Sequence, residues 1–413
     1  MAVTTGARRT TTERPWLGQW NSTVTSYYLL VGATGLLLVI GLVMVLSSST
    51  VTSIAQGKSA YVEFLSQARW ALIGLPFLLI AARIPVRWYK RFAWPALIVV
   101  VGLLTAVLFF GKLVNGNQNW LMVGTFRFQP SELAKLVLAL WLGVVLGRKQ
   151  HLLGSWAQAL LPGALGVGAV VGLVLAGHDL GTALIICLLV LGAYWVSGAP
   201  AKMLGLGTVV GAAAVGYLFI YSQGTNDRLG RILATYGDSC DQASDCYQSL
   251  HGLYGLGTGG LFGVGLGASR EKWRYLPEAH NDFIYAVIGE ELGLLGTLLV
   301  LALFAVLGVA MARVVRRHTD PFVKITTAGV ACWIVGQALV NIGVVIGVLP
   351  VIGVPLPLVS AGGSALVTTM AALGMVIGFA RTEPGAVEAL AARRSVVRRS
   401  VAVLGRGRRS RGR

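Results

Sequence analysis

The sequence predicts an all-α integral membrane protein, a bundle of ten transmembrane helices with one large outer loop between helices 7 and 8. Of its 413 residues, 55% are hydrophobic and only 12% are charged, whereas about a quarter of the residues in a soluble domain are charged. The mean hydropathy is +0.73. Apolar segments long enough to cross a ~30 Å hydrocarbon core recur along the chain, and Lys and Arg are distributed unevenly between them.

The ten predicted spans follow from these apolar segments. Each has the length and composition expected of a transmembrane helix, and most connections between them are short. The spans cover residues 27–47, 68–83, 93–111, 131–147, 156–176, 180–197, 203–222, 282–311, 323–348 and 364–381.

The basic residues predict how the bundle is oriented. With the N-terminus inside, 24 of the 34 Lys and Arg fall in inner segments, nine fall in outer segments, and Lys135 lies within a span. Cytoplasmic loops carry the basic excess, so we expect both termini to be cytoplasmic in a multi-pass protein of the cytoplasmic membrane. The chain then divides into a cytoplasmic segment (1–26), a membrane domain (27–381) and a basic cytoplasmic tail (382–413). The tail suits anionic lipid headgroups or only enforces topology, and no nucleic-acid-binding fold accompanies it.

Three polar outer segments indicate where chemistry would occur. The loop 223–281 is far longer than most connections, and such loops usually carry function. The stretches 114–130 and 349–364 accompany it, the latter with three Pro and three Gly. Cys240 and Cys246 lie in the long loop, where a disulfide could persist, and whether they are bridged is left open.

Acidic residues around the start of the eighth span form the main candidate site, with Glu278 and His280 just before Asp282. Asp282 either occupies the first turn of the helix, after Asn281 as the N-cap, where the helix dipole favours an acid, or serves as a general base at the membrane boundary. Glu290 and Glu291 would lie roughly 12–14 Å into the span. Intramembrane acids usually face a bundle interior, and we expect one of these two to pair with another helix.

Other candidates could bind an anionic substrate. Ser131, Glu132 and Lys135 open the fourth span, where Lys135 either pairs locally with Glu132 or holds a pyrophosphate. Asp179 lies at an outer turn, where a cap is its simplest role. The long loop adds Arg228, Arg231 and Gln248, and Arg suits phosphate. No spacing typical of metal ligands is visible.

Five ordered motifs together resemble the SEDS (shape, elongation, division and sporulation) family. They are NGNQNWLMVGTFRFQPSELAKL, HDLGTA, GTGGLFGVGLGAS, YLPEAHNDFIYAVIGEELG and LPVIGVPLPLVSAGGS. The Asn-Asp of HNDF and the Ser-Ala-Gly-Gly of LVSAGGS are similar to the division branch rather than the elongation branch. Ala361, where Tyr is common, and His178, where Pro is common, depart from the pattern, but neither alters Asp282.

The resemblance implies an enzyme that polymerises lipid II, a disaccharide-pentapeptide on a polyprenyl pyrophosphate, into β-1,4 glycan strands on the outer face. Asp282 would accept the proton of the attacking 4-hydroxyl. Cations would meet the leaving pyrophosphate, and a divalent Mg or Mn ion could share this task. The expected partners are a class B penicillin-binding protein transpeptidase and other division proteins at the septum. A lipid II flippase, an elongation-type polymerase and a non-enzymatic scaffold are the alternatives.

Overall fold

Ten long helices form the body of the molecule in the residues that the structure describes. The computed structural model describes residues 24–55, 57–114, 117–124, 126–152, 154–221, 247–273 and 275–390. The long helices are α2 (Thr25–Ala55), α3 (Val62–Ala81), α4 (Val86–Phe110), α5 (Pro130–Arg148), α6 (Trp156–Ala176), α7 (Leu180–Ser197), α8 (Ala201–Tyr221), α11 (Ile284–Arg317), α12 (Pro321–Val345) and α13 (Gly363–Arg381).

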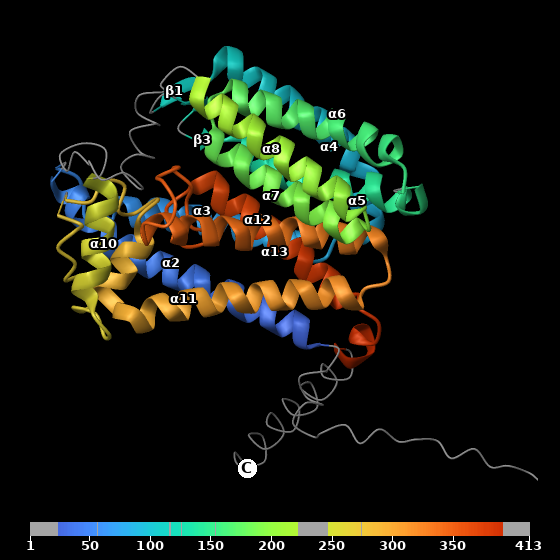
Figure 1. The fold of residues 1–413 in the computed structure, drawn as a ribbon. Coiled ribbons are helices and arrows are strands. Elements are labelled where there is room, and N and C mark those ends of the chain that lie inside the picture. The colour runs from blue at the N-terminus through green and yellow to red at the C-terminus, as the bar shows by residue number, and fades with distance from the viewer. Residues whose placement is uncertain are drawn as a thin grey trace, which may run out of the picture.

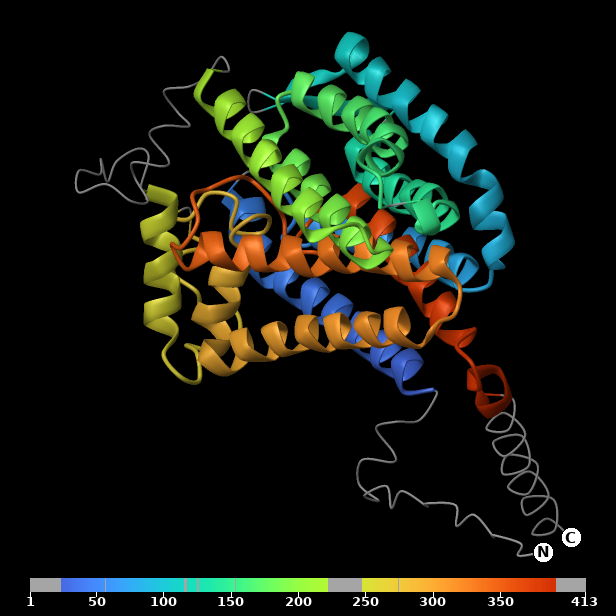
Figure 2. The same ribbon diagram turned by 45° about the vertical axis from the view of Figure 1, so that its right-hand side comes forward.

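Each predicted span corresponds to one of these helices, which confirms the prediction of an all-helical multi-span membrane protein. Eight of the described helices are long and apolar enough to cross a membrane. In α6 and α8 the apolar stretches found among the described residues, Gly163–Ala176 and Ala201–Gly211, are shorter than this. Figures 1 and 2 show the helices side by side in one bundle.

The segments predicted to be outer and inner gather at opposite ends of this bundle. We call them the Asp282 end (residues 112–114, 117–124, 126–128, 247–273, 275–283 and 346–362) and the Lys90 end (residues 82–90, 148–152, 154–155, 318–321 and 382–390). At the Lys90 end, Lys90 pairs with Asp320 at 2.7 Å, and Arg381 donates a hydrogen bond to the carbonyl of Ala82. The connections therefore alternate between the two ends, as the distribution of Lys and Arg predicts.

Helix α5 lies at the centre of the bundle. Fifteen of its 19 residues are buried, and it packs against α4, α7 and α12. An outer helix such as α3 has only four buried residues and leaves most of its apolar side chains on the surface, where lipid would cover them. Polar residues on α5 are therefore held inside protein.

The eighth span is interrupted, which the sequence does not predict. Helix α11 kinks at Gly293, whose φ of 69° and ψ of −165° lie outside the helical region. The kink frees backbone groups that the segment after α10 (Tyr247–Gly259) satisfies. Val264 donates its N–H to the carbonyl of Glu290 at 2.9 Å, and Leu294 donates to that of Gly260 at 2.9 Å. A short first half of α11 therefore carries the candidate acids.

Two further features of the Asp282 end differ from expectation. The stretch before α5 forms a small antiparallel sheet in the order β1 (Lys112–Val114), β2 (Asn117–Val123), β3 (Phe126–Phe128). Its outer strands have three residues each, too few for an alternating pattern to be recognised. Helix α10 packs against α11 within the long loop, and Figure 1 shows it across the end of the bundle, beside the start of α11.

Candidate active site

Asp282 lies at the Asp282 end, two residues before α11 begins at Ile284. The residue at the N-cap position is Phe283, which makes no side-chain cap, so Asp282 is not in the first helical turn as the sequence suggests. Its side chain is half-buried. A Cβ built on Gly353 would lie 3.6 Å from the carboxylate oxygen Oδ2. The carboxylate thus faces the segment 351–356, which enters this end of the bundle between α12 and α13.

Side-chain hydrogen bonds fix the backbone on both sides of this contact. Asn341 of α12 donates from Nδ2 to the carbonyl of Asp282 at 2.7 Å and to that of Val354 at 2.8 Å. Ser360 donates to the carbonyl of Asn281 at 2.7 Å. Buried amide and hydroxyl donors of this kind hold a chain in one conformation, since leaving a carbonyl unpaired costs about 1–3 kcal/mol. The position of Asp282 is therefore set by α12 and the segment 351–361.

Lys135 is buried in the bundle, with only 1% of its surface exposed. Its ammonium lies 2.9 Å from Glu132 Oε1, 3.1 Å from Gln337 Oε1 and 4.9 Å from the centre of the Trp333 ring. The local pair with Glu132, one of the two readings of the sequence, is thus present. With its charge surrounded by protein, Lys135 supports the site from inside rather than presenting itself to a ligand.

The Lys135 cluster connects to the segment beside Asp282 through α12. Gln337, which accepts from Lys135, donates from Nε2 to the carbonyl of Pro355 at 2.8 Å. Gln337 and Asn341 are four residues apart and so lie on one face of α12. Lys135, Gln337 and Asn341 therefore form a continuous polar support behind the site.

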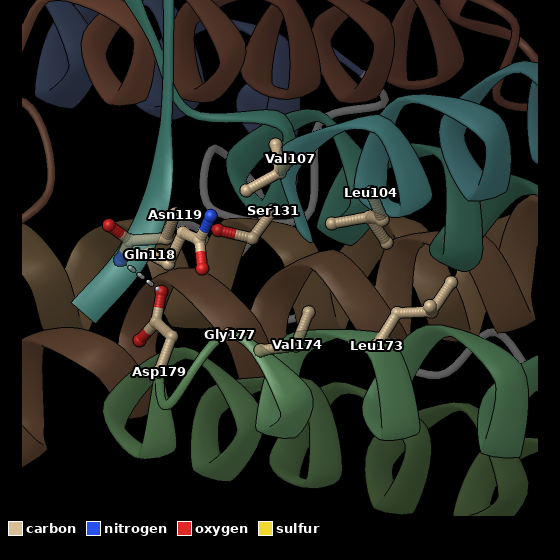
Figure 3. Close-up of a pocket in the computed structure, with 9 residues that line it drawn as sticks. All are labelled: Leu104, Val107, Gln118, Asn119, Ser131, Leu173, Val174, Gly177 and Asp179. Carbon is tan, nitrogen blue, oxygen red and sulfur yellow. Dashed lines mark hydrogen bonds between the residues drawn. The ribbon is translucent and has the colours of Figure 1, made fainter. Parts of the chain in front are cut away.

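Asp179 caps a helix. Its Oδ1 accepts from the backbone N–H of Thr182, and its Oδ2 accepts from the side chains of Thr182, Asn119 and Gln129 at 2.8 to 3.0 Å. Figure 3 shows Asp179 and Ser131 on opposite sides of a small pocket, with Asn119 between them. The hydroxyl of Ser131 is buried and has no hydrogen-bond partner within the described part of the chain.

The two intramembrane acids have structural partners. Glu290 accepts from the Ser269 hydroxyl and from the Arg270 N–H at 2.7 Å, which fixes the loop after α10. Glu291 pairs with Lys272 at 3.0 Å and accepts from the Ser47 hydroxyl of α2. The expectation that one of them pairs with another helix is confirmed by Glu291.

The remaining candidates are spread over the Asp282 end. Gln248 lies in α10 and is half-buried. Glu278 is exposed at a turn with φ of 55° and accepts from the side chain of Asn281. His280 is half-buried, and its carbonyl accepts from the N–H of Ala361 at 3.0 Å. Arg228, Arg231, Cys240 and Cys246 lie outside the described residues.

The polar residues behind the site were not predicted from the sequence. Gln337 and Asn341 are amides in an apolar span, and their spacing of four residues was the available signal. Gln67 of α3 was missed for the same reason. It is buried, donates to the carbonyl of Ser360 at 3.1 Å and accepts from the N–H of Gly362. Among the described residues no group of three His, Cys, Asp or Glu is placed to hold a metal ion.

The fold and this site define a class of polytopic membrane protein with one carboxylate, supported by buried polar side chains, at one end of the bundle. Residues 28–384 match the family model FTSW_RODA_SPOVE, described as "Cell cycle protein". The chain therefore belongs to the FtsW/RodA/SpoVE family, the SEDS family.

Relatives with assigned names are similar over most of the chain. The probable peptidoglycan glycosyltransferases FtsW of Mycobacterium tuberculosis and Mycobacterium bovis are each 39% identical over 392 residues, covering 94% of this chain and 73% of theirs. The FtsW of Aromatoleum aromaticum is 37% identical over 84% of this chain and 85% of its own.

Solved structures have the same fold. A chain of a peptidoglycan synthase complex, from work on the coordination of polymerization and crosslinking, superposes with a TM-score of 0.69 at 27% identity, covering 85% of this chain and 96% of that one. The rod shape determining protein RodA of Thermus thermophilus superposes with a TM-score of 0.65 at 28% identity, covering 86% and 97%.

Proposed function

We propose that this protein is a peptidoglycan glycosyltransferase of the FtsW type that polymerises lipid II on the outer face of the cytoplasmic membrane, with Asp282 as its general base. The observation that carries the proposal is the placement of Asp282. It is a half-buried carboxylate at the end of the bundle assigned to the outside, held through its backbone by Asn341. Family membership and the names of the relatives support the reaction.

The reaction needs one proton acceptor and one stabilised leaving group. The 4-hydroxyl oxygen of the acceptor sugar attacks the anomeric carbon of the donor, a C–O bond forms with inversion, and the bond to the pyrophosphate oxygen breaks. Asp282 accepts the hydroxyl proton as attack proceeds. Polyprenyl pyrophosphate leaves with the electron pair of the broken bond, and nearby positive charge stabilises it.

Cations for the pyrophosphate would come from the outer loop. Lys135 is enclosed by Glu132 and Gln337, so we assign it to positioning. Arg228 and Arg231 in the long loop are the candidates for direct contact. The described residues do not form a preformed divalent cation site. If Mg or Mn takes part, Asp282 would supply one carboxylate, because Mg²⁺ commonly takes one or two carboxylates plus substrate phosphates.

The flippase alternative loses its main support. It requires Glu290 and Glu291 to line a transport path, but both are buried and hold the loop after α10 and helix α2. A purely scaffolding role gives no reason for the support behind Asp282. The names of the most similar relatives favour a division role over an elongation role.

A transpeptidase partner and other division proteins are part of the proposal. The structural neighbour comes from a peptidoglycan synthase complex that couples polymerization with crosslinking. We expect this chain to work with a class B penicillin-binding protein at the division septum, with both termini in the cytoplasm.

The test is polymerisation of fluorescent lipid II by purified protein with its cognate transpeptidase partner. Asp282→Asn keeps the shape of the side chain and removes its basicity, so glycan ladders should disappear while yield and partner binding stay unchanged. Glu63→Gln, which changes another half-buried carboxylate outside the site, is the matched control and should polymerise like wild type. Ladders made by Asp282→Asn at the wild-type rate would refute the base assignment.

A further inference from the structure

A second cavity lies at the Lys90 end, far from Asp282 along the bundle. It has a volume of about 180 Å³. It lies where the start of α4, the last turns of α5 and the start of α12 meet, and its lining includes Lys90, Arg148, Asp320 and Phe322. The reaction proposed above uses none of these residues.

Two glycines of α5 shape the inner wall of this cavity. A Cβ on Gly143 would lie 2.1 Å from the hydroxyl of Thr326, and one on Gly147 would lie 3.3 Å from the backbone nitrogen of Phe322. Small residues four apart let two membrane helices approach closely. Helices α5 and α12 therefore meet backbone to backbone, and the cavity wall has no side chain at these two positions.

Positive charge dominates the cavity. Lys90 pairs with Asp320 at 2.7 Å, and Asp320 also accepts from the N–H of Phe322 to cap α12. An ammonium has three donors, so Lys90 keeps donors for another ligand. Arg148 is exposed and makes no side-chain hydrogen bond or ion pair with the described residues. After Asp320 is counted, one full positive charge remains, carried by a guanidinium suited to phosphate.

The charges around His318, beside the cavity, are also mostly positive. Burial lowers the pKa of His318; Asp320 opposes this, while Lys324 and Lys90 lower the pKa further. His318 thus adds no charge at neutral pH.

The side of the cavity formed by α4 carries aromatic residues of the kind found at a membrane interface. On α4, Trp94 is four residues after Lys90, on the same face of the helix, and is 48% exposed. Trp88 and Phe92, two residues to either side of Lys90, are 41% and 53% exposed and lie on the opposite face. Trp88 stacks on Phe92, and Trp94 packs edge-on against Trp141 of α5. Exposed Trp near a helix end is typical of the headgroup level. A ligand reaching Arg148 along the face that carries Trp94 would place an apolar part against α4.

We propose that this cavity binds the phosphate headgroup of an anionic phospholipid of the inner leaflet, with Arg148 and Lys90 as donors and the acyl chains along the face of α4 that carries Trp94. A cavity of about 180 Å³ has room for several water molecules or for a phosphate group. Inner-leaflet anionic lipids are also what a basic cytoplasmic surface attracts. The site joins α4, α5 and α12, so an occupied cavity ties α12 to its neighbours.

The experiment is native mass spectrometry of the purified protein titrated with dioleoyl phosphatidylglycerol or dioleoyl phosphatidylcholine. Wild type should retain the anionic lipid at least fivefold more than the neutral one. The double variant Lys90→Ala/Arg148→Ala should lose this preference, and Lys90→Arg/Arg148→Lys should keep most of it. The control Arg83→Ala/Arg316→Ala removes two exposed cations from the same end but none from the cavity, and it should behave like wild type.

Each result bears on the proposal. Equal losses in the cavity variant and the control would mean that only net charge matters, which overturns the site. Displacement of the lipid by millimolar inorganic phosphate, with phosphate itself retained, would show a free-anion site instead of a lipid site. The charge-preserving variant separates lipid binding from folding: if it keeps the stability of wild type but retains no anionic lipid preference, the proposal is wrong.

Discussion

Asn341 donates one amide proton to the carbonyl of Asp282 and the other to the carbonyl of Val354, at 2.7 and 2.8 Å. One side chain thus joins the segment that carries the candidate base to the segment that faces it. The arrangement ties the geometry of the site to helix α12, and through Gln337 to the buried Lys135.

Replacing Asn341 with Leu should lower the rate of polymerisation more than it lowers substrate affinity. Leu has a similar volume but no donor, so two carbonyls lose their partner, at about 1–3 kcal/mol each where they stay buried. We expect kcat to fall at least tenfold while KM for lipid II changes less than threefold, measured with fluorescent lipid II. Thr327→Val is the matched control, because it removes from the same helix a buried hydroxyl that has no partner among the described residues. A large rise in KM with unchanged kcat would contradict a positioning role.

The ion pair between Lys272 and Glu291 should show strong coupling in thermal unfolding. Both side chains are at least 95% buried, and removing one partner of a buried pair costs about 3–5 kcal/mol because the other charge is left uncompensated. Lys272→Met alone should therefore be strongly destabilising, and adding Glu291→Gln should restore much of the loss. Lys112→Met, at an exposed position of β1, provides the control. Additive losses in the double variant would mean that the pair is not coupled.

The bundle could be predicted from the sequence because the apolar length of each span and the Lys and Arg between spans are local properties of the chain. Apolar length located all ten helices, and the Lys and Arg count sorted their connections into the two ends at which the structure places them. The small sheet before α5 and the kink at Gly293 could not be predicted. The outer strands of the sheet are too short to show an alternating pattern. The kink depends on backbone partners in another segment, as when Val264 donates to Glu290.

The candidate site was predictable in part for the same reason. Asp282 stood out as an acid at a span boundary, and Lys135 as a cation inside a span. Whether Lys135 faces a ligand or the interior depends on Gln337 and Trp333, about 200 residues away in the chain. The sequence also shows Asn341 as one amide among apolar residues, and only the fold shows that it reaches the backbone of Asp282.

Stability should depend on pH through Glu271, which pairs with His251 at 2.6 Å beneath α10. Burial raises the pKa of the Glu271 carboxyl above its ordinary value of 4.5; the hydrogen bond and charge of His251 lower it, and the charge of Glu290 raises it. A raised pKa means that the folded protein binds this proton more tightly than the unfolded chain, so the contribution to stability is present at low pH and is lost as pH rises through the raised pKa. Glu271→Gln mimics the protonated form. The melting temperature of this variant minus that of wild type should therefore increase as the pH rises above about 4.5. Differential scanning fluorimetry measures both temperatures. A relative melting temperature that falls with pH would show that the ion pair with His251 outweighs burial.

The kink at Gly293 should tolerate no side chain. Its φ of 69° with ψ of −165° lies in a region that only glycine readily adopts, and a Cβ there would lie 2.3 Å from the backbone nitrogen of Gly263. Gly293→Ala should therefore destabilise the protein by at least about 2 kcal/mol, the sum of backbone strain and overpacking. It should also lower polymerisation, because the first half of α11 begins next to Asp282. Gly102→Ala is the control: a Cβ at that helical position meets nothing within 4 Å, and the change should be neutral or stabilising by about 0.5–1 kcal/mol. Thermal unfolding of the two variants in detergent measures the difference, and equal stability would show that α11 does not need the kink.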